Sequence, residues 1–287
     1  MPVATLTQDK DQYLALFGRF EKDAAAKGQV WLQTPRQAAF ARFAELGFPT
    51  VHDEDWRFTS VAPIAKTAFV LPAERRADVP RRALEPFAFP DLACSRLVFV
   101  DGRYAPELSS LRPLPAGMTV RGLAEALTAD RGVVEAHLAR YAAVQHDAFT
   151  ALNTAFVEDG AFVHIPRGVV IEEPIHLLYL STAGPAPTIT HPRTLIVAEE
   201  NSQATIVEDY ASLGEAANFS NAVTELVAGE NCVLSHYLIE RESRQAFNVS
   251  TLRIQQGRSS NVASHSLLLG GALVRNNIHP VIAGEGS

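Results

Sequence analysis

The chain has 287 residues, which is enough for one or two domains with a sizeable core. Its net charge of −7 argues against broad, non-specific binding of nucleic acid, because such binding needs clustered Lys and Arg. No apolar run approaches the roughly 18 to 20 residues of a membrane-spanning helix, so we expect neither nucleic acid nor a membrane among its partners.

Two cysteines, Cys94 and Cys232, lie far apart in the chain. Residues 1–10 do not contain a basic segment followed by an apolar one, which is the pattern of a secretory signal. Without an export signal a disulfide framework is not expected, and these features together predict a cytoplasmic location.

Residues 1–158 predict a helical and mixed region. Aromatic residues recur at helical spacing within residues 7–26. Thr34 and Pro35 are typical of an N-cap followed by proline at the first helical position, and the helix that they start would end near Gly47.

The pattern between residues 71 and 158 is mixed. Residues 71–92 are rich in Pro, Arg and Ala and predict a surface connection. Asp101-Gly102 follows the apolar run 96–100 and predicts a β-hairpin turn. Further helices are expected at residues 121–128, 133–141 and 146–156.

From Asp159 the chain changes to short runs rich in Val, Ile, Leu and Thr, separated by Gly, Asn, Ser, Glu and Pro. This pattern predicts short strands joined by turns. The runs are residues 161–165, 175–180, 194–197, 204–207, 223–227, 233–239, 249–254 and 263–269.

A short turn sequence recurs through this second half of the chain. Its copies are residues 197–202, 227–232, 254–259 and 282–287, so the spacing is about 28 residues. A repeat of this length with short strands indicates a solenoid, and we predict a parallel β-helix core over residues 159–287. A β-sandwich with evenly spaced turns is the alternative.

The fourth copy of the turn comes at the end of the chain, with no outgoing strand after it. We therefore expect the chain to be a fragment of a longer protein. Residues 260–287 would then form an uncapped coil, and uncapped strand edges favour aggregation.

The sequence lacks the common catalytic motifs. It contains no G-x-x-x-x-G-K-[ST] loop, no H-E-x-x-H, no C-x-x-C and no G-x-S-x-G. Any step that consumes ATP is therefore expected to depend on a partner chain.

The candidate metal ligands are Cys232, His236 and His265. Cys232 and His236 are four residues apart, a spacing that places both on one face of a strand. A register of about 28 residues would bring His265 onto the same face one coil later, and Cys and His suit zinc or an iron–sulfur species. The favoured interpretation is that Cys232 is a small buried residue and His236 a core histidine among apolar neighbours.

Two acidic pairs, Glu199-Glu200 and Glu208-Asp209, flank one predicted strand. Clustered acids on one outer face would suit a β-helix enzyme that cleaves polysaccharides. Both pairs are expected at turn edges, where charge also keeps a solenoid soluble.

Several segments resemble the SufD family and its paralogue SufB. The acidic, tryptophan-containing segment 54–59 (Glu-Asp-Trp-Arg-Phe-Thr) is similar to a signature near the start of SufD proteins. The similarity continues through residues 160–169, 173–175, 191–197, 221–226 and 269–277.

The resemblance implies a right-handed parallel β-helix, an N-terminal helical region and a C-terminal helical domain. It implies a scaffold that acts with a SufB-like paralogue and a SufC-like ABC ATPase in iron–sulfur cluster assembly. The cluster would be held by the assembled complex, with which a reduced flavin has been associated. The family's C-terminal helical domain and functional histidine should lie beyond Ser287, so no catalytic or cofactor-binding residue is assigned.

We therefore predict a non-catalytic scaffold subunit of an iron–sulfur cluster assembly complex. The alternatives are a polysaccharide-acting β-helix enzyme and a stand-alone metal-binding protein that uses Cys232, His236 and His265.

Overall fold

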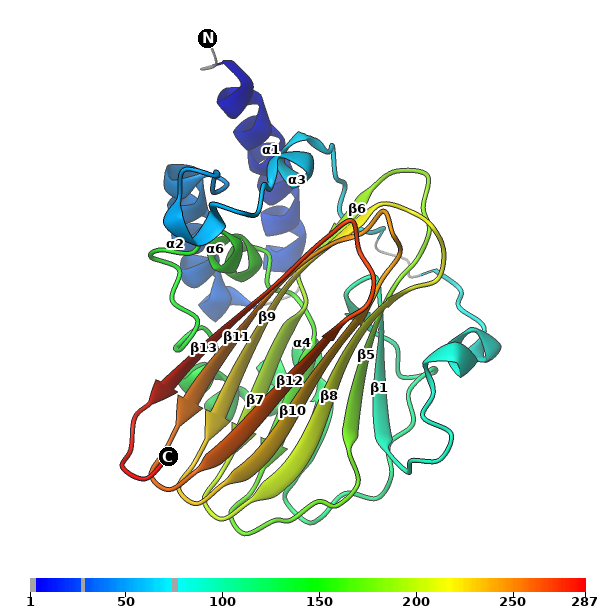
Figure 1. The fold of residues 1–287 in the computed structure, drawn as a ribbon, viewed down its shortest axis with the longest axis vertical. Coiled ribbons are helices and arrows are strands. Elements are labelled where there is room, and N and C mark those ends of the chain that lie inside the picture. The colour runs from blue at the N-terminus through cyan, green and yellow to red at the C-terminus, as the bar shows by residue number, and fades with distance from the viewer. Residues whose placement is uncertain (1–3, 27–28, 74–76) are drawn as a thin grey trace.

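A computed structural model describes residues 4–26, 29–73 and 77–287 of the chain. The second half winds between two facing parallel sheets, with a group of helices packed beside them (Figure 1). Sheet I has the strand order β13-β11-β9-β7-β4-β3, and sheet II has the order β12-β10-β8-β5-β1-β2. The solenoid prediction is confirmed.

The N-terminal part contains most of the helices. They are α1 (Ala4–Ala26), α2 (Val30–Leu46), η1 (Glu54–Trp56), α3 (Ala62–Lys66), η2 (Arg81–Phe87), α4 (Leu123–Ala129), α5 (Arg131–His137) and α6 (Ala148–Ala155).

The strands begin before residue 159. They are β1 (Ser95–Val100), β2 (Arg103–Tyr104), β3 (Thr119–Gly122), β4 (Ala161–Ile165), β5 (Ile175–Ser181), β6 (Thr188–Thr190), β7 (Arg193–Ala198), β8 (Gln203–Ser212), β9 (Asn218–Ala228), β10 (Val233–Arg241), β11 (Phe247–Gln256), β12 (Asn261–Leu268) and β13 (Leu273–Ile282).

The first strands join the two halves of the chain. β1 pairs in parallel with β5, and β3 pairs antiparallel with β4, so each sheet takes up a strand from before residue 159. The division into residues 1–158 and 159–287 stays a prediction. β1 and β2 form the expected hairpin, with Asp101 and Gly102 both at positive φ.

The register of the sheets gives the repeat its length. In sheet I, Val227 pairs with Val197 thirty residues earlier, and Ala228 pairs with Gln256 twenty-eight residues later. From β4 and β5 to β13, the strands of neighbouring coils pair in parallel. The alternative fold, a β-sandwich, needs antiparallel sheets.

The recurring turn places one residue per coil in the left-handed region of φ. Asn201, Asn231 and Ser259 hold this position, with φ of 59°, 57° and 55°. The third copy of the repeat is shifted by one residue from the sequence alignment, because Val227 pairs with Gln255 and not with Ile254. The residue at positive φ defines the turn. Asn is a common residue in this conformation and Ser is not, so the turn is harder to locate from the sequence where Ser occupies the position.

The space between the two sheets is filled by small and branched apolar side chains together with stacked Phe99, Tyr179 and Tyr210. These side chains alternate along each strand with residues that point outward, as the period of two requires. The outward faces are also covered. Residues of η2 and its flanks, including Val79 and Leu84, pack on sheet II.

Helices α1, α2, α3 and α6 cover the outer face of sheet I (Figure 1). Phe17 of α1 stacks on Phe40 of α2 with ring centroids 4.1 Å apart, and Phe149 of α6 contacts Phe219 of β9. α2 begins at Val30, so the prediction that Thr34 caps this helix is wrong, and Pro35 lies within it. Leu32, in the turn before Pro35, is buried in the apolar core. This burial favours a helix that begins before the proline.

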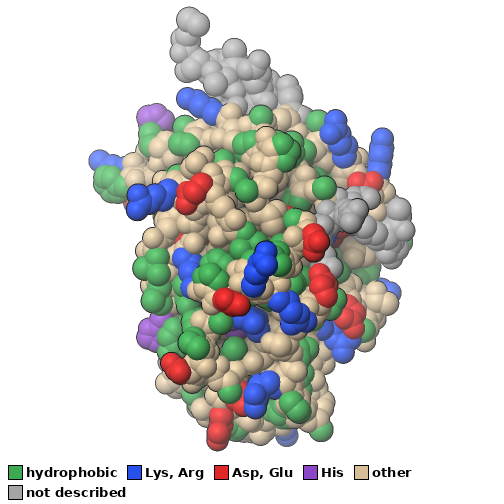
Figure 2. Space-filling view, turned by 90° about the vertical axis from the view of Figure 1, so that its right-hand side faces the viewer, with side chains coloured by type: hydrophobic (Ala, Val, Ile, Leu, Met, Phe, Trp, Pro, Cys, Tyr) green, Lys and Arg blue, Asp and Glu red, His purple; other side chains and the backbone are tan. Residues whose placement is uncertain are grey.

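The last coil is the most exposed part of the solenoid. β12 and β13 each pair along one edge and expose large apolar side chains, including Leu268 and Ile282, which are 46% and 65% exposed. No helix in the part of the chain that the structure describes is long and apolar enough to span a membrane. Basic and acidic side chains are intermixed on the face of the molecule that carries β1 (Figure 2).

Candidate functional site

The interior of the solenoid contains a buried carboxylate, Glu208. Alternation along β8 directs it inward together with Ile206 and Tyr210. His236 Nε2 lies 3.0 Å from Glu208 Oε1, Thr224 Oγ1 donates to the same oxygen at 2.7 Å, and Tyr210 Oη donates to Oε2 at 2.9 Å. Thr194 Oγ1 of β7 also donates to Oε2 at 3.4 Å, so the carboxylate receives hydrogen bonds from three strands besides its own.

These contacts decide the charge of Glu208. Burial by itself raises the pKa of the carboxyl, but the hydrogen bond and charge of His236, with the hydroxyls of Thr224 and Tyr210, hold it below its ordinary value. Glu208 is thus an anion bonded on several sides. Because Glu208 and His236 are each 1% exposed, the pair is placed to join coils rather than to act on a molecule from solvent.

The three predicted metal ligands do not share one face. Cys232 lies in a buried turn, where its Sγ donates to the carbonyl of Glu199 at 2.9 Å. His236 points into the solenoid and pairs in register with Ser264, so His265 lies opposite Tyr237 and stacks on its ring outside. The register that placed His265 on the same face as His236 is wrong by one residue.

Among the described residues, no group of three His, Cys, Asp or Glu side chains is arranged to hold a metal ion. The interpretation of His236 as a histidine of the core agrees with its burial and its bond to Glu208. A metal site on Cys232, His236 and His265 stays an untested hypothesis.

A second interior carboxylate, Glu242, follows β10. It accepts hydrogen bonds from Asn218 Nδ2 at 2.7 Å, Ser220 Oγ at 2.8 Å and Asn248 Nδ2 at 2.8 Å. Burial raises the pKa of Glu242 to about 7, and the nearby carboxyl of Glu240 adds to the rise, whereas these neutral donors oppose it. Glu242 therefore exchanges a proton close to neutral pH.

The outer face of sheet I carries a buried ion pair beneath the helices. Arg193 of β7 donates to Glu225 of β9 at 2.6 Å, and both side chains are at most 1% exposed. Glu225 also accepts from the backbone N–H groups of Ala139, Tyr141 and Ala142. Burial raises the pKa of Glu225, but Arg193 and these N–H groups outweigh it and hold the pKa below its ordinary value.

The outer face of sheet II carries another buried group of charges. Asp209 Oδ2 lies 3.0 Å from His176 Nε2, and its Oδ1 accepts from Arg241 Nε at 2.9 Å. Arg241 also donates to the carbonyls of Pro86 and Phe87. The group thus fastens the segment around η2 to the sheet.

Of the two acidic pairs, Glu199-Glu200 lies in the turn after β7, as predicted, whereas Glu208-Asp209 does not lie at a turn edge. Glu208 and Asp209 lie inside β8 and not at a turn edge, and as neighbours on a strand they point to opposite sides of sheet II. Glu199 lies near His164, and Glu200 pairs with Arg167. These acids do not form one face.

Sequence reasoning missed Arg193, Glu225 and Glu242. Arg193 lies in the segment 191–197 noted for its family resemblance, yet nothing in a single sequence shows that a strand-borne arginine is buried. The alternation of β9 contains a usable signal, because Asn221 and Glu225 interrupt the outward-facing positions that otherwise hold Phe219 and Val223.

The fold and these charge pairs define a class of protein, a parallel β-solenoid with a helical cap, whose buried charges join one coil to the next and the cap to the sheet. Chains of this class present extended surfaces built from repeats.

The chain belongs to the SufBD family. Residues 7–177 match the SufBD protein N-terminal region, and residues 179–287 match the SufBD core domain of the SUF system for FeS cluster assembly.

Two curated relatives illustrate the similarity. The iron–sulfur cluster assembly SufBD family protein slr0076 of Synechocystis sp. is 34% identical over 258 residues, which cover 86% of this chain and 56% of that protein. The iron–sulfur cluster assembly protein SufD of Escherichia coli is 28% identical over 244 residues, which cover 84% of this chain and 54% of that protein. The chain thus spans slightly more than half the length of these relatives.

Proposed function

We propose that the chain is a non-catalytic scaffold subunit of an iron–sulfur cluster assembly complex, acting with a SufB-like paralogue and a SufC-like ABC ATPase in the cytoplasm. The observation that carries this proposal is the match of nearly the whole chain to the two SufBD regions. The names of these relatives, which refer to iron–sulfur cluster assembly, support it.

The organisation of the charges supports a scaffold. Glu208, Asp209 and Glu225 are all buried, and each is bonded to side chains or backbone groups of other strands or of the cap. Such pairs fix the positions of the coils and the cap relative to one another. A surface that binds other subunits requires this rigidity. The cluster is the cargo of the complex, and ATP hydrolysis belongs to a partner chain.

Purification of the tagged protein from its own host tests the proposal. We expect a SufB-like chain and a P-loop ATPase to co-purify with it in fixed proportion, as identified by mass spectrometry. A tagged variant with Arg193→Met, which weakens the cap, serves to separate specific from adventitious capture. Failure to recover either partner from host cells that express both would contradict the proposal.

Anaerobic reconstitution of the isolated chain with iron and sulfide tests the stand-alone alternative. We expect no stoichiometric cluster in the visible absorption spectrum, and no difference between the native chain and Cys232→Ala. A stoichiometric cluster that disappears in Cys232→Ala would replace the scaffold proposal with a metal-binding protein.

A further inference from the structure

The segment that contains η2 crosses the outer face of sheet II, and we call its residues 79–89 the strap. Val79 and Leu84 of the strap are buried in one apolar cluster with residues of that face, among them Val98 and Leu178. Apolar packing is therefore one of the contacts that hold the strap on the sheet.

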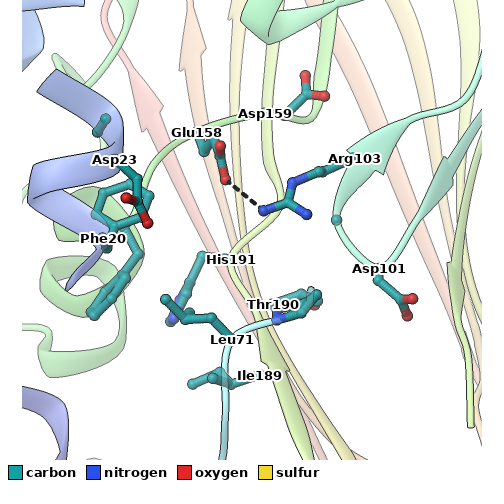
Figure 3. Close-up of a pocket in the computed structure, with 14 residues that line it drawn as sticks. Phe20, Asp23, Leu71, Asp101, Arg103, Glu158, Asp159, Ile189, Thr190 and His191 are labelled. Carbon is teal, nitrogen blue, oxygen red and sulfur yellow. Dashed lines mark ion pairs between the residues drawn. The ribbon is translucent and has the colours of Figure 1, made fainter. Parts of the chain in front are cut away.

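The chain is fixed on both sides of the strap. On the upstream side, Arg103 pairs with Glu158 at 3.6 Å and donates to the carbonyl of Ala73. Leu71 lines a small cavity together with Ile189, beside this ion pair (Figure 3). On the downstream side, strand β1 pairs in parallel with β5. The strap can therefore leave the sheet locally while the chain on either side stays in place.

A buried group of charges fastens the strap to the sheet. Arg241 donates to the carbonyls of Pro86 and Phe87, and its guanidinium lies over the ring of Phe87. Asp209 holds Arg241 in this position, because Arg241 Nε donates to Asp209 Oδ1 at 2.9 Å. Asp209 also binds His176, so the fastening of the strap and the protonation of this histidine depend on one carboxylate.

His176 is enclosed beneath the strap. Its side chain is 1% exposed, and its ring centroid lies 4.9 Å from that of Phe89. Because Asp209 is an anion paired with Arg241, His176 Nε2 carries the proton and donates to it. Nδ1 is then an acceptor, and it has no hydrogen-bond partner among the described residues. A second proton on this ring would be placed on a buried nitrogen without an acceptor.

Charged side chains face His176 from three strands. Arg96 of β1 is its partner in register, Asp209 lies on β8 and Arg241 lies on β10. The strap contributes the uncharged ring of Phe89. Burial lowers the pKa of His176, and the charges of Arg96 and Arg241 lower it further, whereas the hydrogen bond and charge of Asp209 oppose this shift. Protonation beneath the closed strap would set three cations against one carboxylate.

We propose that the strap is an acid-sensitive cover, which leaves the sheet when His176 takes up a second proton. Opening removes Phe89 from the ring and gives Nδ1–H access to water, so that the new donor no longer lacks an acceptor. It also separates the carbonyls of the strap from Arg241. The apolar residues of sheet II beneath the strap then become accessible.

The direction of the effect follows from the two protonation equilibria. The open strap exposes His176, whose pKa returns toward its ordinary value of 6.5, whereas the closed strap holds the pKa lower. The open state therefore binds more protons than the closed state, so a fall in pH favours opening. Between pH 7.5 and 5.5 the equilibrium constant for opening should rise by up to about tenfold.

Hydrogen–deuterium exchange of the purified chain tests the proposal, with mass spectrometry at pH 7.5 and 5.5 and correction for the intrinsic pH dependence of exchange. We expect peptides that cover residues 79–89 to exchange faster at pH 5.5 by up to about tenfold. Peptides from β9 and β11 should stay protected at both pH values. A rise of equal size in those peptides would overturn the proposal, because the whole chain and not the strap would then loosen.

Two variants of a single histidine separate His176 from the other titrating groups. His176→Gln keeps a neutral donor to Asp209 but cannot take up a second proton, so it should abolish the rise at pH 5.5. His265→Gln is the matched control. His265 is exposed on the same sheet, where it stacks on Tyr237, and its variant should keep the rise of the native chain.

Arg96→Gln tests the same charges without changing the histidine. Arg96 Nε has no hydrogen-bond partner, so this variant breaks no bond at that atom. Without the charge of Arg96 the closed strap tolerates a protonated His176 better, and the rise at pH 5.5 should be smaller than in the native chain. The proposal is overturned if the strap of the native chain exchanges at the same corrected rate at both pH values. It is also overturned if His176→Gln retains the full rise, or if Arg96→Gln enlarges it.

Discussion

Arg193 and Glu225 illustrate how a buried charge depends on its partner. Replacing Arg193 by Met keeps much of the apolar stem but leaves Glu225 charged and buried, with only backbone N–H groups around it. Removing one partner of a buried pair costs about 3–5 kcal/mol. We therefore expect Arg193→Met to lower the free energy of unfolding by that amount in urea titrations.

The matched control is Arg131→Met. Arg131 pairs with Glu135 at 3.0 Å on exposed helix α5, and exposed pairs of this kind contribute about 0.3–0.5 kcal/mol. Equal losses in the two variants would show that the buried pair carries no special weight in stability.

Glu242 predicts a pH dependence of stability. Its pKa in the folded chain is about 7, above the ordinary value of 4.5. The folded state therefore binds more protons than the unfolded state between these values, so stability should fall as pH rises from 4.5 to 7. The loss from this group is about 3 kcal/mol.

Glu242→Gln should remove this dependence and stabilise the chain above pH 7. The amide oxygen can still accept from Asn218 and Ser220, and its NH₂ can face Asn248, whose unpartnered Oδ1 becomes available if that amide turns over. Urea titrations from pH 5 to 8 measure the effect, with exposed Glu215→Gln as the control. An unchanged pH profile in Glu242→Gln would show that Glu242 is not the titrating group.

At the residue scale the sequence predicted burial better than bonding. His236 was identified as a candidate core histidine from its apolar neighbours. Glu208 was expected at a turn edge, because a carboxylate within a strand gives no sign that a histidine 28 residues later will meet it. Bonds between coils depend on the register to a single residue, and the spacing of the repeat in the sequence does not fix that register.

At the element scale, the left-handed turn position offers a test of the repeat. Asn is more easily accommodated than Ser in this region of φ, and Asn231 Nδ2 already donates to Asn201 Oδ1 at 3.1 Å. Ser259→Asn should extend this ladder and raise the free energy of unfolding by about 0.5–1 kcal/mol.

The opposite change at the same position is the control. Ser259→Val puts a β-branched side chain at a φ of 55° and should destabilise the chain by at least about 1 kcal/mol. Melting temperatures of the two variants should therefore move in opposite directions. A shift of both in one direction would mean that backbone conformation does not govern this turn.

Element type and spacing were predictable because both are local properties. The strand runs and the hairpin at Asp101-Gly102 follow from residue pattern and turn chemistry. The start of α2 was not predictable from the sequence, because a contact with a distant part of the chain outweighs the local N-cap signal. Arg36, one turn after Leu32, donates to the carbonyl of Val157 at 3.0 Å. This long-range bond holds the helix in place with Pro35 inside it.

At the scale of the whole molecule, the sequence predicted a helical region and a solenoid but not which surface the helices cover. Their aromatic residues meet the outer face of sheet I through Ile189, Phe219 and Val249. That face is defined only by the outward-facing residues of strands that become neighbours when the chain winds into coils. Trp56 of the family signature likewise packs against Arg275 of β13, more than two hundred residues later in the chain.

The exposed coil formed by β12 and β13 predicts self-association of the purified chain. The two strands have unpaired edges, and Leu268 and Ile282 expose apolar surface beside them. Unpaired edges with apolar side chains are sites where chains add to one another, and Lys at such edges prevents this association.

We expect the apparent mass in light scattering to rise with protein concentration. The double variant Leu268→Lys, Ile282→Lys should stay monomeric over the same range, whereas Leu14→Lys with Val51→Lys, at exposed positions in the N-terminal part, should behave like the native chain. Equal association of all three proteins would place the contact elsewhere on the surface.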